Sequence, residues 1–221
     1  MSRDGVRALL LDFGGTLDAD GIAWKERFRR LFEEEAAPAD DFDRVFYAAD
    51  DALVGSIPRD LSFGDTVARL ASGIAERLGR PASAQRVGSR FLASARAHLA
   101  RSAGVLAELH GRYRLGIVSN FYGNLEAVCR ETGLAAHLDA AIDSAVVKAE
   151  KPDRRIFEAA LATLGVGPRK AVFVGDSRPR DMEGARALGM RHVWMHAGDG
   201  EPCCPDDSVI RSFSELPGVL G

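Results

Sequence analysis

The sequence predicts an α/β fold in which a parallel sheet lies between two layers of helices. Short apolar segments that end at glycine or a small polar residue alternate with segments whose apolar residues repeat at helical spacing. These short segments are apolar throughout, as strands covered on both faces are. Between the first and second of them, residues 22–103 show helical spacing alone. We therefore expect a three-layer α/β core with a helical insertion.

Five segments are expected to be strands. The first, residues 6–12, is rich in leucine and stops at a glycine turn, which favours a buried strand over a helix. Asp12 then lies at its carboxyl end. The other expected strands are residues 115–119, 140–142, 171–174 and 192–194, with helices expected up to Thr132, around Phe157 to Leu164 and through Ala187.

The insertion is expected to contain four helices. Its apolar residues recur three and four positions apart, as Trp24 and Phe28 do. Ser62 followed by Asp65 resembles a capping box, and Ser83 is expected to cap the helix that follows it.

Composition bounds the class of protein. The 221 residues are 46% hydrophobic and 28% charged, which allows one or two globular domains and excludes a disordered or collagen-like chain. The three cysteines form neither a disulfide framework nor a metal-ligand pattern. Cys203 and Cys204 are expected to be incidental, with redox sensing as the alternative, and the role of this pair stays open.

Charge and hydropathy favour a small-molecule partner. With 29 basic and 32 acidic residues the net charge is −3, and no long basic run points to nucleic acid. No segment approaches the ~20 apolar residues of a membrane span, and the first residues do not resemble a signal peptide. We expect a cytoplasmic protein, monomer or homodimer, that binds neither nucleic acid nor membrane.

Polar residues follow several of the expected strands directly. Asp12, Ser119 with Asn120, and Asp176 each come after a strand, and Lys151 lies in the loop after another. Because ligand sites in parallel sheets lie beyond the carboxyl ends of the strands, these residues are candidates for one site.

Four segments carry these polar residues in a fixed order. They are Asp12-Phe-Gly-Gly-Thr16, Val-Ser119-Asn120, Lys151-Pro-Asp and Gly-Asp176-Ser-Arg-Pro-Arg-Asp181. Together they resemble the four motifs of the haloacid dehalogenase-like hydrolase superfamily, in its helical-cap phosphatase-like branch. The resemblance implies a Rossmann-like core at residues 1–17 and 104–221 with an inserted α-helical cap at residues 18–103.

The resemblance also implies a reaction, the hydrolysis of a phosphoric monoester of a small metabolite. Asp12 would attack phosphorus and form an aspartyl-phosphate intermediate, and Lys151 would be the second catalytic group. The substrate-binding residues implied are Thr16, Ser119, Asn120 and Lys151, although Asn120 could equally shape its turn. The family also expects Mg²⁺ as cofactor. Its ligands would be Asp12, the backbone carbonyl of Gly14, Asp176 and Asp181, because crowded carboxylates need a cation and all-oxygen sites suit Mg²⁺.

One position departs from the family pattern. Phosphatases of this superfamily usually carry a second Asp two residues after the nucleophile, where it acts as general acid and base, and here that residue is Gly14. Such a group contributes about 10²–10⁴-fold to a rate, so its loss should slow the enzyme rather than abolish it. Good leaving groups, or a carboxylate from Asp18 or Asp20 just downstream, could compensate.

Other functions stay open at this point. A catalytically weak or inactive phosphate-binding or regulatory protein would keep the same motifs. A 2-haloacid dehalogenase typically has an aromatic residue at the position of Gly14 and does not depend on Mg²⁺. A phosphonate hydrolase would need a cap lysine, for which Lys25 is the candidate, and a receiver domain would place its acidic pair before the phosphorylated Asp. Substrate choice would depend on cap residues whose orientation the sequence does not specify. Trp24, Arg27 and Tyr47 could line the pocket, although the helical spacing of Trp24 fits a core residue at least as well.

Overall fold

The computed structural model describes residues 5–36, 38–198 and 208–220. A six-stranded sheet runs through it in the order β3-β2-β1-β4-β5-β6, and every pair of neighbours is parallel. The strands are β1 (Ala8–Leu11), β2 (Arg114–Ser119), β3 (Ala140–Asp143), β4 (Ala171–Gly175), β5 (Arg191–Met195) and β6 (Ser208–Ile210). The predicted α/β class and all five predicted strands are confirmed. The short edge strand β6 was not predicted.

Strand β1 lies at the centre of the sheet and is fully buried. Successive side chains of a strand point to opposite faces, so Leu9 and Leu11 join one hydrophobic cluster while Ala8 and Leu10 join the other. This two-sided burial explains why the segment is apolar throughout. It also fixes Asp12 at the carboxyl end of the central strand.

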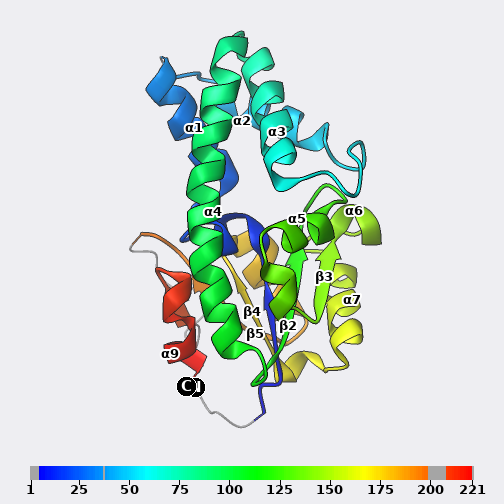
Figure 1. Ribbon diagram of the computed structural model, residues 1–221. Coiled ribbons are helices and arrows are strands. Elements are labelled where there is room, and N and C mark those ends of the chain that lie inside the picture. Colours follow the sequence, from blue (N-terminus) through cyan, green and yellow to red (C-terminus); the bar gives the residue numbers. More distant parts are fainter. Residues whose placement is uncertain (1–4, 37, 199–207, 221) are drawn as a thin grey trace.

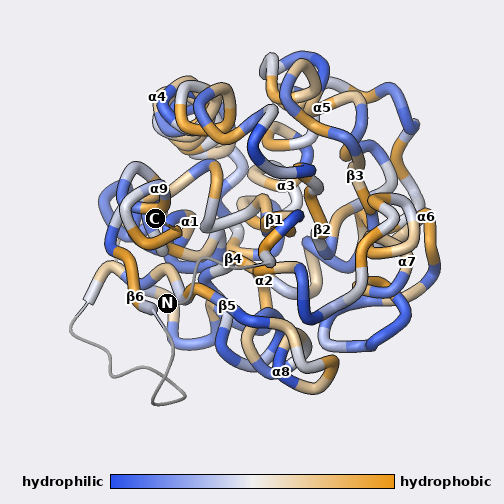
Figure 2. The backbone as a smooth tube through the Cα atoms, turned by 90° about the horizontal axis from the view of Figure 1, so that it is seen from below, coloured by the Kyte–Doolittle hydropathy of each residue, from blue (hydrophilic) through white to orange (hydrophobic). Residues whose placement is uncertain are grey.

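Helices cover both faces of the sheet (Figure 1). One face is covered by α5 (Leu125–Glu131), α9 (Leu216–Leu220) and the second half of α4 (Ala84–Leu109). The other is covered by α7 (Arg154–Leu164) and α8 (Glu183–Ala187). Figure 2, a view along the strands, shows the sheet between these two layers. The three-layer arrangement predicted from the sequence is confirmed.

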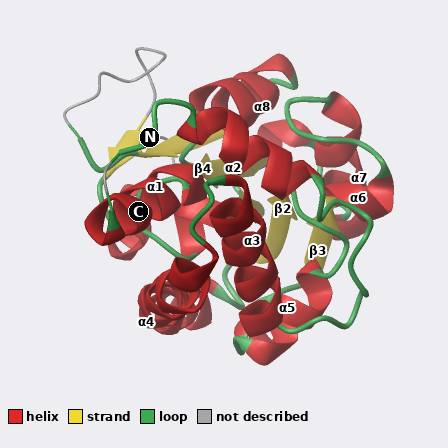
Figure 3. Cartoon of the chain, turned by 90° about the horizontal axis from the view of Figure 1, so that it is seen from above, coloured by secondary structure: helices red, strands yellow, loops and turns green. Residues whose placement is uncertain are grey.

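A helical region is inserted between β1 and β2, as predicted. It contains the four expected helices, α1 (Trp24–Glu35), α2 (Phe42–Asp51), α3 (Phe63–Arg77) and α4. Its interior is aromatic, and the Phe28 and Phe91 rings stack at 4.2 Å between centroids. Seen from above, α2 and α3 lie over the sheet (Figure 3). The cap limits at residues 18 and 103 stay a prediction, because α4 continues past residue 103 without a break.

The two predicted helix caps have different outcomes. The Ser62 hydroxyl accepts the backbone N–H of Asp65 at 3.0 Å, so the cap of α3 is confirmed. The predicted cap by Ser83 is wrong. Ser83 ends a short 3₁₀ turn, Pro81–Ser83, that leads directly into α4, and its side chain makes no capping hydrogen bond.

Within the described part of the chain, none of the helices combines the length and the apolar character that crossing a membrane requires. Cys129 is buried in the core. The prediction for Cys203 and Cys204 falls outside the described residues.

Candidate active site

The turn after β1 positions Asp12 beside the end of β4. The Asp12 backbone N–H donates to the carbonyl of Val174 at 2.9 Å. The chain then turns tightly through Phe13–Leu17, where Gly15 has a φ of +91°. A Cβ on Gly15 would lie 2.6 Å from a carboxylate oxygen of Asp176, so only glycine lets the first loop approach the loop after β4 this closely.

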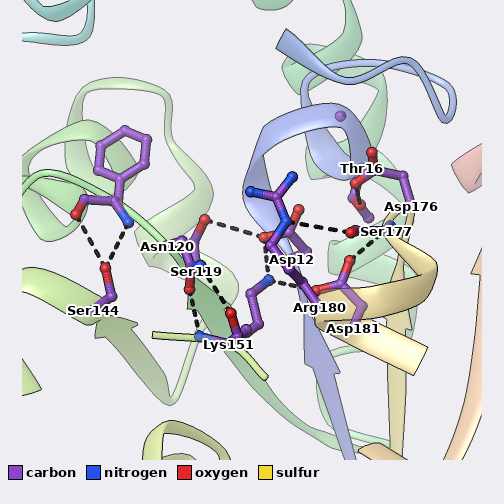
Figure 4. A network of polar contacts seen from close by, with 12 residues as sticks. Asp12, Thr16, Ser119, Asn120, Ser144, Lys151, Asp176, Ser177, Arg180 and Asp181 are labelled. Atoms are coloured by element: carbon purple, nitrogen blue, oxygen red, sulfur yellow. Dashed lines mark hydrogen bonds and ion pairs between the residues drawn. The ribbon is translucent and has the colours of Figure 1, made fainter. Parts of the chain in front are cut away.

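Asp12 lies between a buried lysine and a serine hydroxyl (Figure 4). The Lys151 ammonium donates to Asp12 Oδ1 at 2.6 Å and lies 2.7 Å from Asp181 Oδ1. The Ser119 hydroxyl donates to the same Asp12 oxygen at 3.1 Å. Burial lowers the pKa of Lys151, but the charges of Asp12 and Asp181 outweigh it, so this pKa is raised and the lysine stays charged. The result is a fixed positive group against the Asp12 carboxylate.

Three carboxylates meet at this end of the sheet. Oxygens of Asp12, Asp176 and Asp181 all lie within 4.8 Å of one another. Burial, and then the charge of Asp12, raises the pKa of Asp176 well above its ordinary value, and burial also raises the pKa of Asp181. Such a cluster is unfavourable unless more positive charge is present.

The donor set fits a small divalent cation. All the cluster's donors are oxygens, which suits Mg²⁺. Asp181 Oδ1 is buried and has no hydrogen bond, although it pairs with the charge of Lys151. Its second oxygen accepts the Ser177 backbone N–H at 2.9 Å, which fixes the carboxylate in place. The three carboxylates could hold a metal, and the Gly14 backbone lies beside them in the same cavity wall.

Asn120 connects the loop after β2 to the loop that carries Lys151. Its side-chain amide donates to the Lys151 carbonyl at 3.2 Å, and its side-chain oxygen accepts the Lys151 backbone N–H at 2.7 Å. This reciprocal pair positions the lysine. Asn120 also lines the cavity described next, so the structure is compatible with both roles considered from the sequence.

A cavity of about 280 Å³ lies over Asp12, between the sheet and the helical region. The floor contains the Asp12 cluster, Lys151, Ser119 and Asn120. Trp24, Tyr47 and Asp50 line it from the helical region, and Tyr122 and Arg180 line it from the loops of the core. The volume is close to that of sites for small organic ligands.

Two residues singled out in the sequence lie elsewhere. Thr16 is fully buried and outside the cavity wall, and its hydroxyl donates to Asp176 at 3.2 Å. Its geometry is that of a group positioning Asp176, and substrate binding by Thr16 stays a prediction. Arg27 also lies outside the wall, where its guanidinium packs 4.0 Å from the centroid of the Phe91 ring. Tyr47 lies in the wall as expected. Trp24 lies there too and also packs in the hydrophobic core, so both roles considered for it are found.

Neither Asp18 nor Asp20 is placed to act as an acid in the cavity. Asp18 is fully buried outside the cavity wall and accepts hydrogen bonds from Gly15 N, Trp24 Nε1 and Arg27 Nη1 at 2.7, 2.8 and 2.7 Å. Asp20 also lies outside the wall and accepts the Ser212 hydroxyl at 3.1 Å. The sequence left compensation by either residue open, and this geometry argues against both.

The space next to Gly14 is filled by an aromatic ring. Gly14 has a φ of −79°, which any residue can adopt. A Cβ at this position would lie 3.2 Å from Trp24 Nε1 and 3.4 Å from Trp24 Cδ1. A side chain at position 14 therefore requires the indole to move by a few tenths of an ångström.

Sequence reasoning missed Asp50, Tyr122 and Arg180 as cavity residues. Tyr122 comes two residues after Asn120, and Arg180 comes directly before Asp181. Nearness to these motif residues was therefore an available signal. Asp50 offered no such signal. Its place in the wall depends on how the helical region packs on the core.

Comparisons of the sequence with known proteins point to the same family as the four motifs. Residues 6–189 match the family model described as haloacid dehalogenase-like hydrolase. A cattle (Bos taurus) protein named haloacid dehalogenase-like hydrolase domain-containing protein 3 is 42% identical over 114 residues, 48% of this chain and 45% of its own. A phosphoserine phosphatase of Thermus thermophilus is 44% identical over 66 residues, 30% of this chain and 26% of its own. The chain thus spans less than half the length of the curated relatives it matches here.

Solved structures show the same fold across almost the whole chain. The crystal structure of a haloacid dehalogenase-like phosphatase from Thermococcus onnurineus has a TM-score of 0.60 at 24% identity and covers 98% of both chains. Solved 2-haloacid dehalogenases share the fold as well. At such low identity these neighbours show the fold alone and do not separate the two activities.

Proposed function

This chain belongs to the haloacid dehalogenase-like hydrolase family, and we propose that it is a Mg²⁺-dependent phosphatase of a small phosphorylated metabolite. The observation that carries the proposal is the pairing of one buried lysine with a cluster of three carboxylates on the floor of a small cavity. The name of one relative supports the proposal, because 66 residues of this chain match a phosphoserine phosphatase at 44% identity.

Asp12 is the proposed nucleophile. Its carboxylate would attack phosphorus as the bond from phosphorus to the leaving oxygen breaks, which gives an aspartyl phosphate that water then hydrolyses. Lys151 and Ser119 already contact Asp12, so their ammonium and hydroxyl are positioned for the oxygens of the transferring group. Fixed donors of this kind stabilise developing charge without reorganising during the reaction. Asn120 holds Lys151 in place.

The carboxylates of Asp12, Asp176 and Asp181 and the carbonyl of Gly14 are the proposed Mg²⁺ ligands. The metal, when bound, neutralises negative charge between these carboxylates and the phosphoryl group. The chain's part is to fix its donors. Ser177 holds Asp181 through its backbone N–H, and Thr16 holds Asp176 through its hydroxyl.

We also propose that Gly14 stands where related phosphatases have their second Asp. With Trp24 against this position, no side chain acts there on the leaving oxygen. Substrates whose leaving groups need little protonation, such as acyl, anomeric or aryl phosphates, are therefore expected to react best.

A second candidate activity, 2-haloacid dehalogenation, deserves a direct test because one observation favours it. Trp24 brings an aromatic ring to the space beside Gly14, where that branch typically carries an aromatic residue. The cluster of three carboxylates favours the metal-dependent phosphatase. Phosphonate hydrolysis is disfavoured because the Lys25 ammonium is bound to Asp43 at 2.8 Å.

The test is hydrolysis of 4-nitrophenyl phosphate, acetyl phosphate and a panel of sugar phosphates, with and without Mg²⁺, by the wild-type chain and Asp12→Asn. We expect turnover that requires both Mg²⁺ and Asp12. Metal-independent release of chloride from 2-chloropropionate would establish the dehalogenase instead. No turnover on any of these substrates, together with phosphate binding, would establish a binding or regulatory protein.

A further inference from the structure

We propose that Asp50, at the end of α2, is the general acid and base that replaces the missing side chain at Gly14. This inference rests on the proposed phosphatase function and adds a catalytic residue to it. The carboxyl group lines the same cavity as Asp12, but from the helical region rather than from the core.

Few carboxyl groups could fill this role. Apart from the Asp12, Asp176 and Asp181 cluster, the carboxylic residues in the described cavity wall are Glu26 and Asp50. Glu26 is already paired through both of its oxygens, which lie 3.7 Å from the Lys25 ammonium and 3.5 Å from Arg29 Nε. Among the described residues, none of the ion pairs involves Asp50.

A neutral phenol holds Asp50 in place. The Tyr122 hydroxyl donates to Asp50 Oδ1. Tyr122 is itself buried, packs 4.9 Å from Phe121 between ring centroids, and accepts the backbone N–H of Gly55 at 3.1 Å through its carbonyl. The second oxygen of Asp50 has no described hydrogen bond. The carboxyl group is therefore fixed at the wall with one oxygen available to a ligand.

Its place suits a leaving group. The leaving oxygen lies roughly in line with the attacking oxygen and on the far side of phosphorus. Asp12 attacks from the end of β1, so the leaving group extends away from the sheet, toward the helical region that contains α2. Trp24 occupies the position beside Gly14, so Asp50 is the carboxyl group left on that side of the cavity.

The surroundings of Asp50 favour its protonated form. Burial raises its pKa above the ordinary value, and the negative charges of Asp51 and Glu150 raise it further. The Tyr122 hydrogen bond and the charge of Arg180 lower this pKa, and burial outweighs them. A carboxyl group with a raised pKa can carry a proton closer to neutral pH, as a general acid requires.

The proton balance closes over the two steps. In the first, the Asp12–phosphorus bond forms, the bond to the leaving oxygen breaks, and the Asp50 proton moves to that oxygen, giving an alcohol, an aspartyl phosphate and ionised Asp50. In the second, water attacks phosphorus and gives one proton to Asp50 as the Asp12–phosphorus bond breaks. Hydrogen phosphate leaves, and both aspartates return to their initial states.

The test compares leaving groups in Asp50→Asn. We expect first-turnover release of alcohol from an alkyl phosphate to fall by about 10²-fold or more, and that of 4-nitrophenol from its phosphate by less than about 5-fold, since nitrophenolate leaves without a proton. The fall in the alkyl rate at high pH, where wild-type Asp50 is ionised, should disappear. Asp50→Glu, which keeps an acid, should retain more alkyl activity than Asp50→Asn.

Asp40→Asn is the matched control, because it removes one exposed carboxylate just before the start of the same helix and lies outside the cavity wall. It should change neither rate nor pH profile. Equal losses on both substrates, or an unchanged pH profile in folded Asp50→Asn, would overturn the role of Asp50 while leaving the phosphatase intact. If Asp50→Asn does not fold, Tyr122→Phe tests the role instead. It removes the hydrogen bond that lowers the pKa of Asp50, so the high-pH fall in the alkyl rate should move to higher pH, and an unmoved fall would overturn the role. Absence of any Mg²⁺- and Asp12-dependent turnover in the wild type would instead remove the proposed function.

Discussion

The indole N–H of Trp24 donates to Asp18 at 2.8 Å, and this bond holds the Trp24 ring against Gly14. A buried carboxylate thus holds an aromatic ring against the place where a Cβ at position 14 would lie. Arg27 neutralises the charge of Asp18 from the same helix as Trp24. Glycine at position 14, tryptophan at 24 and aspartate at 18 therefore form one packed arrangement, so changing one of them affects the others.

The first prediction follows from that packing. Gly14→Asp should raise turnover of alkyl phosphates more than that of aryl phosphates, because only poor leaving groups need an added acid. The effect should be small in the single variant, since its Cβ would lie 3.2 Å from Trp24 Nε1, and larger when combined with Trp24→Phe. In the Asp50→Asn background, the combined change should restore at least part of the lost alkyl activity. A matched increase on both substrate types, measured by initial rates, would contradict this account.

The second prediction concerns stability. Asp18→Asn removes the charge that pairs with Arg27, whose side chain is 10% exposed, and should lower the free energy of unfolding by about 3–5 kcal/mol. Asp43→Asn is the control, because that carboxylate pairs with Lys25 and Arg29 at the exposed surface and should contribute far less. Urea unfolding followed by tryptophan fluorescence measures both. Equal, small losses would mean that the Asp18 network is not a stabilising unit.

Much of the site could be predicted because it depends on the ends of strands. Asp12, Ser119 and Asp176 follow apolar segments that form strands. Parallel pairing brings the ends of these strands to one edge of the sheet, independently of how the helices pack. The cluster with Asp181 and the contact with Lys151 are therefore close to what the motifs imply.

The rest depends on packing that periodicity cannot describe. Helical spacing predicted α1, and α2 was expected only as one of four helices. Neither expectation says that Trp24 lies against Gly14 or that Asp50 reaches Tyr122. Asp18 was considered as an acid because it follows the motif closely, yet a carboxylate bound by three donors has little freedom to act on a substrate. Such partners come from separate elements and are known only once the helical region is placed.

The third prediction uses the thiol of Cys129. Burial raises its pKa to about 12, so about one thiol in ten thousand is ionised at pH 8, compared with about a quarter for an ordinary cysteine of pKa near 8.5. In a Cys203→Ser, Cys204→Ser variant, labelling by a thiolate-specific reagent should be about 10³-fold slower in the native protein than in urea. The native rate should rise tenfold per pH unit until unfolding takes over. Rapid labelling of folded protein at pH 8 would show that Cys129 is accessible and ionisable.

The last prediction separates charge repulsion from metal binding. Without metal, Asp176 lies within 4.8 Å of two other carboxylates, and only part of that negative charge is offset by Lys151. Asp176→Asn relieves the repulsion, so it should raise the melting temperature in EDTA. Mg²⁺ at about a hundred times its Kd should stabilise the wild type by about 2.7 kcal/mol and Asp176→Asn far less, because the variant lacks a ligand.

Asp60→Asn removes an exposed carboxylate outside the cluster and should show neither effect. The two opposite shifts, higher melting without metal and a smaller gain with it, are what a true metal cluster requires. A variant that is destabilised in EDTA and still gains fully from Mg²⁺ would exclude Asp176 as a ligand.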